Sequence, residues 1–193
     1  MEKKIARSLL HMEKDSRVRL LDAALDVLGR HGAARLTVRA TEDAAGLPHG
    51  SIRHHFGDRA AMVVALFGHL AEREGAQVDR PVAASLEHWL GAGRNLTLAR
   101  YELFLMAARD PTLRSPLIQA RERFVAIAAK RFGPSAAPAI VAALDGVTLD
   151  ALVRGQPDPE RLRDAVNRIT ASASQGDRKS PLSSKVSETA PAP

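Results

Sequence analysis

The chain has 193 residues, a formal charge of +6 and no cysteine. This length supports one or two small domains, and the lack of thiols excludes disulfides, thiolate metal ligands and cysteine nucleophiles. No apolar stretch approaches the roughly 18 residues that span a bilayer. Met1 to Met12 lack the apolar centre of a signal peptide. We therefore expect a soluble cytoplasmic protein with no membrane partner, and scarce aromatics (4%) favour helices over sheets.

The first predicted element follows a flexible N-terminal arm, residues 1–14, that has no clear periodicity. It is an amphipathic helix, in which Asp15 or Ser16 can cap the start and Gly32 can end the helix in a left-handed turn. Its apolar residues recur at spacings of three and four and share one face: Val18, Leu21, Leu25 and Leu28.

Two short helices joined by a tight turn come next. Thr37 is an N-cap candidate for a helix through about Ala44. Gly46 permits a sharp turn, because glycine reaches positive φ without a Cβ penalty. Pro48 fits the first turn of the second short helix, which ends near Phe56. This arrangement lets one helix enter the major groove of DNA.

The second short helix is small and polar. Gly50 and Ser51 allow a close approach to DNA, and hydrogen-bond donors come from His49, Arg53, His54 and His55. The basic balance of the chain suits a polyanionic partner, since each cation near a phosphate releases condensed counterions. We therefore predict a double-stranded DNA operator as the partner of this unit.

The rest of the chain is also predicted to be helical. Asp58 caps a helix, and Asp110 is an N-cap followed by an N1 proline. From Ser174 the chain is rich in serine, proline and charge, which predicts a disordered tail over residues 174–193. The predicted helices cover residues 58–77, 81–90, 94–108, 110–132, 135–154 and 158–173.

An ordered set of motifs resembles the N-terminal domain of the tetracycline-repressor-like (TetR-like) transcriptional regulators. The match is dense from Arg17 to Leu70, and beyond it only the helical character and helix order match. The resemblance implies an all-α fold with an N-terminal three-helix helix-turn-helix DNA-binding domain, residues 15–60, and a C-terminal helical ligand-binding and dimerisation domain, residues 61–173. The motifs are Leu36-Thr-Val-Arg39, Ala45-Gly-Leu47, Gly50-Ser-Ile52, His55-Phe56 and Asp58-Arg59.

The resemblance also implies which residues contact DNA. Thr37, Arg53 and Arg59 stand where the family contacts phosphate, and His49 opens the base-facing start of the recognition helix. The complete candidate set is Thr37, Arg39, Pro48, His49, Gly50, Ser51, Arg53, His54 and Arg59.

Four residues depart from the family pattern. Pro48 replaces a capping serine, and Arg53 replaces a tyrosine. Thr41 and Glu42 stand where an aliphatic residue and an alanine usually pack in the second helix. A buried glutamate is unfavourable unless it is paired or tilted to water. Either Glu42 reaches water, toward Arg39 or Arg53, or this domain is less stable or weaker on DNA than its relatives.

The family resemblance implies an unknown small-molecule effector in the C-terminal domain. Ordinary core packing explains each candidate as well, and Arg100 and Glu102 are interpreted as a solvated face. Because few of the candidates are polar, we expect an apolar or aromatic effector. The candidates for lining its pocket are His69, Trp89, Tyr101, Phe104 and Met106.

A homodimer is also implied, usually through the last two helices of the family fold. The candidate interface is one apolar stripe with the spacing of a helix seam: Ile140, Leu144, Val147 and Ala151. The alternative is that this stripe meets only its own domain.

No enzymatic constellation is present in the sequence. We find no Ser-His-Asp set, phosphate-binding glycine loop or pair of acids, so we predict no catalytic residue and no cofactor. His54 and His55 point about 100° apart on a helix and do not share a metal ion. We therefore predict a homodimeric, ligand-relieved repressor on a palindromic operator. The alternative function, motivated by Thr41 and Glu42, is a helical sensor or interaction protein of the same fold with weak or no operator binding.

Overall fold

The computed structural model describes residues 2–75, 80–155 and 158–176. Within these ranges every regular element is helical and no strand occurs, which confirms the predicted all-α class. The α-helices are α1 (Glu2–His31), α2 (Val38–Ala45), α3 (Ser51–Phe56), α4 (Arg59–Gly75), α5 (Val82–Leu90), α6 (Arg94–Arg109), α7 (Arg114–Phe132), α8 (Ala137–Arg154) and α9 (Pro159–Gly176). Two single 3-10 turns are η1 (Ala33–Arg35) and η2 (Pro111–Leu113).

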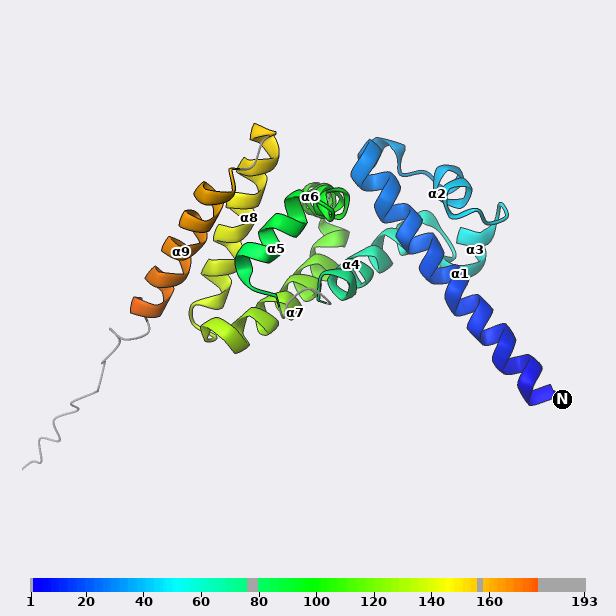
Figure 1. The fold of residues 1–193 in the computed structure, drawn as a ribbon. Coiled ribbons are helices and arrows are strands. Elements are labelled where there is room, and N and C mark those ends of the chain that lie inside the picture. The colour runs from blue at the N-terminus through cyan, green and yellow to red at the C-terminus, as the bar shows by residue number, and fades with distance from the viewer. Residues whose placement is uncertain (1, 76–79, 156–157, 177–193) are drawn as a thin grey trace, which may run out of the picture.

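The helices form two groups that are joined by α4 (Figure 1). Helices α1, α2 and α3 lie at one end of the molecule, and α8 and α9 lie at the other. In the part of the chain that the structure describes, no single helix is long and apolar enough to cross a membrane. Only one pair, Pro111–Phe132 with Ala137–Arg154, meets those criteria together, and it is bent by 109°.

Two main cores hold these groups together. The first core contains residues of α1, α2, α3, α4 and α6. It therefore continues past residue 60, where the two predicted domains meet. The second joins α5, α8 and α9. The first core includes Leu20, Leu28, Ile52, Met62, Phe67 and Leu103, and the second includes Leu86, Trp89, Ile140, Leu144 and Val166.

The first helix is longer than the sequence predicts. Helix α1 begins at Glu2, so residues 2–14 are helical and are not a flexible arm. Asp15 and Ser16 lie inside the helix and do not cap its start. The physical reason is that no glycine or proline interrupts residues 2–28, and the segment is rich in good helix formers. At the other end of the chain α9 reaches Gly176, so the predicted tail is wrong for residues 174–176, and its remainder lies outside the described residues.

Local capping signals predict most of the observed boundaries. The Thr37 hydroxyl accepts the Ala40 N–H at 3.1 Å and caps α2, and Gly46 ends that helix with φ 61°. The Asp58 carboxylate accepts the Ala61 N–H at 2.8 Å near the start of α4. These predictions are confirmed because each depends on residues within one turn of the boundary.

The predicted start of the second short helix is wrong. Helix α3 begins at Ser51 and not at Pro48. Gly50 has φ 95° and ψ −6°, which lies outside the right-handed helical region. The Ser51 N–H donates to the Pro48 carbonyl at 3.2 Å. Residues 48–51 therefore form a tight turn that leads into α3.

Candidate DNA-binding and ligand-binding sites

An arginine from α1 fixes the turn between α2 and α3. Arg19 Nη2 donates to the Ala45 carbonyl at 2.8 Å, at the C-terminal end of α2. The side chain therefore satisfies a carbonyl that the helix leaves without a partner. Ile52 and Leu36 are fully buried in the first core and anchor the segments on either side. The turn and α3 are thus held to α1 by both polar and apolar contacts.

Glu42 is buried and caps the recognition helix α3. Its side chain is 2% exposed. Oε1 accepts the Gly50 N–H at 3.0 Å and the Ile52 N–H at 2.9 Å. The expectation that Glu42 reaches water, toward Arg39 or Arg53, is therefore wrong. The carboxylate instead pairs with backbone donors at the start of α3, where negative charge is favourable.

Thr41 is also accommodated in the interior. Its side chain is fully buried, and its hydroxyl donates to the Thr37 carbonyl at 2.9 Å. Together, Thr41 and Glu42 satisfy backbone groups at the two short helices. These departures from the family pattern therefore leave no unpaired polar group on α2.

The predicted DNA-contact residues lie mostly on one exposed surface. Eight of the nine are exposed, and Ser51 is half-buried, with its hydroxyl donating to the Pro48 carbonyl at 2.5 Å. An acid lies among them: Asp43 Oδ1 is 3.0 Å from His49 Nε2, and Asp43 Oδ2 is 3.8 Å from Arg39 Nε. Asp43 therefore orients His49 in the free protein. Besides Thr37 and Arg59, the exposed residues are Arg39, Pro48, His49, Gly50, Arg53 and His54.

Two other candidates have partners inside the protein. Arg59 is exposed, and its Nε donates to the Leu36 carbonyl at 2.7 Å. The Thr37 hydroxyl is the cap of α2. Arg59 thus ties the start of α4 to the segment before α2, so a substitution here affects structure as well as charge.

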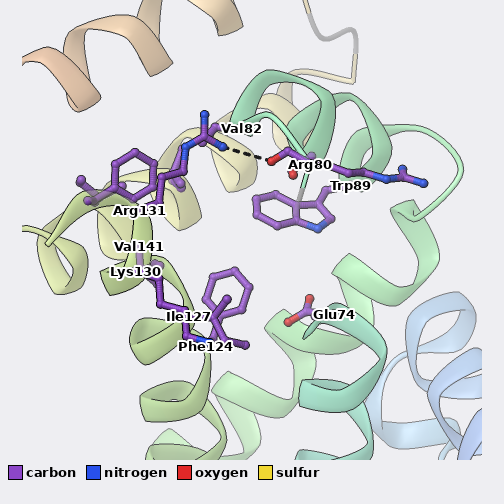
Figure 2. Close-up of a pocket in the computed structure, with 14 residues that line it drawn as sticks. Glu74, Arg80, Val82, Trp89, Phe124, Ile127, Lys130, Arg131 and Val141 are labelled. Carbon is purple, nitrogen blue, oxygen red and sulfur yellow. Dashed lines mark hydrogen bonds between the residues drawn. The ribbon is translucent and has the colours of Figure 1, made fainter. Parts of the chain in front are cut away.

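A cavity of about 440 Å³ lies among α5, α7 and α8 (Figure 2). Its walls are largely apolar and aromatic, and the rings of Trp89 and Phe124 are 6.3 Å apart. Among the predicted effector residues, Trp89 lines this cavity. The apolar wall also includes Val82, Ile127, Phe132, Ile140, Val141 and Leu144.

Glu74 lines the cavity, and a network of charges lies behind it. Arg100 Nη1 donates to Glu74 Oε1 at 2.8 Å, and Arg121 Nη1 donates to Asp145 Oδ2 at 2.7 Å. The Arg100 guanidinium also lies 5.0 Å from the Trp89 ring. Arg100 is only 4% exposed, so its interpretation as part of a solvated face is wrong. The reason is that α6 is enclosed by helices on several sides, which the sequence does not reveal.

Burial shapes the chemistry of this network. Desolvation raises the pKa of the Glu74 carboxyl, and the nearby Arg100 charge opposes that rise. Arg100 Nε and Nη2 are buried and have no hydrogen-bond partner among the described residues. A buried donor without an acceptor is unfavourable. The pair is therefore only partly satisfied in the free protein.

The other four predicted effector residues lie elsewhere. Phe104 lines a narrow space of about 30 Å³ beside the cavity, together with Arg100 and Glu74. Tyr101 donates its hydroxyl to the Asp145 carbonyl at 2.7 Å. His69 bonds to Asp22 at 2.8 Å, and Met106 packs against the first core. Of the five predicted effector residues, only Trp89 thus lines the large cavity, and Phe104 lines the narrow space beside it. Glu102, also interpreted as solvated, is half-buried and accepts the Ala33 N–H at 3.3 Å.

The predicted dimer stripe faces the interior of its own chain. Ile140 and Leu144 are buried against Trp89, and Ala151 is buried near Leu90. Val147 is half-buried and packs beside them. The three buried residues are therefore unavailable to a second copy, which favours the alternative that the stripe meets its own domain. The outward face of α8 instead carries small and apolar residues, Ala142, Gly146, Leu149 and Val153.

Sequence reasoning missed the contributors that act over long sequence distances. Arg19 and Glu74 stand in ordinary amphipathic patterns, and nothing local distinguishes them. Glu42 had a usable signal, because it is an acid at a position that the helix pattern buries. The missing capping serine at position 48 was a second signal, since the turn needed an acceptor from elsewhere.

Comparisons with known proteins agree with this architecture. The family model described as tetracyclin repressor-like, C-terminal domain, matches residues 73–172. The one described as bacterial regulatory proteins, tetR family, matches residues 20–66. An HTH-type transcriptional repressor of Mycobacterium tuberculosis (Rv1474c) is 33% identical over 93 residues, which are 48% of this chain and 46% of that repressor. The match thus spans about half the length of that relative.

Solved structures resemble most of the chain. A transcriptional regulator from Streptomyces coelicolor A3(2) is 26% identical, with a TM-score of 0.69 over 80% of this chain and 98% of that one. A TetR family member from Streptomyces coelicolor A3 is 33% identical, with a TM-score of 0.66 over 80% and 97%. The multidrug binding protein EbrR, complexed with ethidium, is 33% identical, with a TM-score of 0.65 over 80% and 97%. The chain therefore belongs to the TetR family of bacterial transcriptional regulators.

Proposed function

We propose that the protein is a homodimeric repressor that binds a palindromic operator through α3 and leaves it when a small molecule enters the cavity. The observation that carries this proposal is the hydrogen bonding of Glu42 to the start of α3. It fixes the recognition helix while the polar residues around it remain exposed. A rigid, polar helix of this kind suits base reading in the major groove.

The alternative function is a sensor that has lost operator binding. Thr41 and Glu42 motivated it, because unpaired polar groups would weaken the DNA-binding unit. Both side chains have partners in the structure, so that motivation is removed. The DNA-binding proposal is thereby favoured over the sensor.

The outward face of α8 supports a homodimer. Val153 is 78% exposed and Leu149 is 46% exposed, and they lie at spacing i, i+4. Ala142 and Gly146 continue the same face with small side chains, which permit close helix packing. A second copy that packs here would bury apolar surface and pair two recognition helices. Operators read by such dimers have half-sites about 34–36 Å apart.

The cavity supports control by a flat aromatic molecule. Trp89, Phe124 and Phe132 form its aromatic wall, and its volume is about 440 Å³, within the range of small-molecule sites. The related EbrR has been solved with proflavin, ethidium and malachite green, which are all aromatic compounds. An aromatic wall suits aromatic ligands.

Helix α6 connects the cavity to the DNA-binding helices. Arg100 on α6 pairs with Glu74, which lines the cavity. On the same helix, Asn95 Nδ2 donates to Asp26 of α1 at 2.8 Å. A Cβ at Gly29 would collide with the Asn95 carbonyl, so α1 and α6 are in close contact. A ligand that shifts α6 would therefore shift α1, to the extent that it binds the two states with different affinity.

The experiment is a fluorescence anisotropy titration of the full chain on labelled DNA from the promoter beside its own gene. We expect specific binding that survives a large excess of unrelated DNA and weakens steeply with salt. A folded dimer that shows no preference for any promoter segment, even at low salt, would contradict the proposal and favour the sensor.

A further inference from the structure

We infer that the effector carries a negative charge, as an aromatic or apolar body with an anionic end such as a carboxylate. This inference rests on the proposed function, in which the cavity is the effector site. The anionic end would lie at the mouth of the cavity, and the aromatic body would lie against Trp89 and Phe124.

The mouth of the cavity is basic. Arg80, before α5, and Lys130 and Arg131, in the last turn of α7, all line it and are exposed (Figure 2). Arg131 Nη1 donates to the Arg80 carbonyl at 3.2 Å, which holds the two segments together across the mouth. Within the described residues none of the three cations has an ion-pair partner. Three cations that line one cavity and have no ion-pair partner among the described residues favour an anion there.

The cavity offers no free carboxylate to a cationic ligand. Glu74 is the one acid among the described lining residues, and it already pairs with Arg100. Asp145, behind it, already pairs with Arg121. A cationic ligand would therefore have to displace Arg100, and an anionic ligand would displace nothing.

The unpaired donors of Arg100 add to this preference. Nε and Nη2 of this buried guanidinium have no hydrogen-bond acceptor in the described part of the chain, and Nη2 lies 3.9 Å from Asp145 Oδ1. They border the narrow space of about 30 Å³ that shares Glu74, Phe124 and Val141 with the cavity. Buried donors raise the local positive potential and favour an electron-rich ligand.

A helix dipole alone does not explain the basic mouth. Cations in the last turn of a helix stabilise its C-terminus, and this accounts for Lys130 and Arg131 on α7. It does not account for Arg80, which lies outside any helix before α5. What the three side chains have in common is the cavity that they line, because they do not all belong to one helix terminus.

Three probes with one ring system test the charge preference. They are 2-naphthoate, 2-naphthylmethylammonium and neutral 2-naphthalenemethanol, titrated into the full chain by calorimetry at low salt. Trp89 is the only tryptophan, so its fluorescence reports binding at this site. We expect 2-naphthoate to bind roughly tenfold more tightly than the ammonium compound, because screened charge pairs contribute modestly.

A pair of double variants assigns that preference to the mouth. Lys130→Gln with Arg131→Gln removes two cations from the cavity mouth. The matched control, Arg114→Gln with Arg123→Gln, removes two exposed cations from the same helix outside that cavity. We expect the first to lose roughly tenfold in 2-naphthoate affinity and the control to change little, with both retaining the thermal midpoint of the parent.

Three outcomes overturn the inference. Tighter binding of the ammonium compound, or equal losses in the two double variants, overturns the anionic effector and leaves the cavity as a ligand site. If no probe changes Trp89 fluorescence while operator binding is intact, the cavity fails as the effector site and the inference fails with it. Loss of operator binding alone would count against the proposed function and not against the charge preference.

Discussion

The DNA-binding region and the cavity region each bury one glutamate, and the two are satisfied in different ways. Glu42 accepts two backbone N–H groups from the segment that it orders. Glu74 pairs with Arg100, whose Nε and Nη2 have no hydrogen-bond partner in the described structure. Both carboxylates are buried to a similar degree, at 2% and 8% exposed.

The difference agrees with the role that we propose for each region. A carboxylate held by backbone donors fixes one geometry, because the backbone cannot move without unfolding the turn. A side-chain pair with unused donors can change its partners at lower free energy. The first arrangement suits a surface that reads a fixed groove, and the second suits a site that responds to a ligand.

The largest expected effect comes from breaking the pair in the cavity region. Arg100→Met leaves Glu74 buried without its cation, and we expect a loss of about 3–5 kcal/mol in the free energy of unfolding. Urea denaturation measures it. The double variant Glu74→Gln with Arg100→Met should recover most of the loss, and failure to recover would mean that Arg100 acts mainly through packing on Trp89.

Removing the glutamate of the DNA-binding region comes next. Glu42→Ala leaves two buried N–H groups unpaired, with an expected loss of about 3 kcal/mol. Glu42→Gln keeps an oxygen that accepts both bonds and should lose about 1 kcal/mol. In the alanine variant, the backbone amides of residues 50–52 should exchange hydrogen faster than in the parent. The exchange rates in the cavity region should change less. Uniform changes across both regions would contradict the local role of Glu42.

A charge on the outward face of α8 should separate the two copies. Val153→Arg is expected to give a monomer and to weaken operator binding roughly 100-fold, because the second half-site is no longer tethered. Analytical ultracentrifugation and anisotropy measure the two effects. Leu105→Arg, at an exposed apolar position on α6, is the control. If the Val153→Arg variant remains a dimer, the dimer interface lies elsewhere.

Arg59 distinguishes charge from structure within the DNA-binding region. Arg59→Ala should weaken binding to all sequences and reduce the salt slope by about one unit. Arg59→Lys keeps the charge and alters the bond to the Leu36 carbonyl, so it should retain the slope. A changed base preference with an unchanged slope in Arg59→Ala would contradict a phosphate contact.

The smallest effect is a pH dependence that comes from the cavity region. Burial raises the pKa of the Glu74 carboxyl, so the folded state binds a proton more readily than the unfolded state. The stability linked to Glu74 is therefore fully present below the unfolded pKa of about 4.3 and is lost as pH rises through the folded pKa. Relative to Glu74→Gln, the parent should gain stability on acidification. If the denaturation midpoint of the parent instead falls on acidification, relative to that of Glu74→Gln, the Arg100 charge controls the pKa of Glu74.

Local signals predict the fold well, and long-range packing limits what can be predicted of the sites. Thr37, Gly46 and Asp58 mark helix ends because each acts within one turn of its own position. The spacing of Ile140 and Leu144 correctly places them on one face, but spacing cannot say which helix covers that face. The partners of Glu42 lie eight and ten residues away, across a turn whose shape only the folded chain defines.

The most direct test of the account is selection of sheared genomic DNA on the immobilised full chain, followed by sequencing. The account predicts a shared inverted repeat whose half-sites are about one helical turn apart, and loss of that enrichment in Glu42→Ala. Enrichment of fragments with no common sequence, by a folded and dimeric protein, would contradict it.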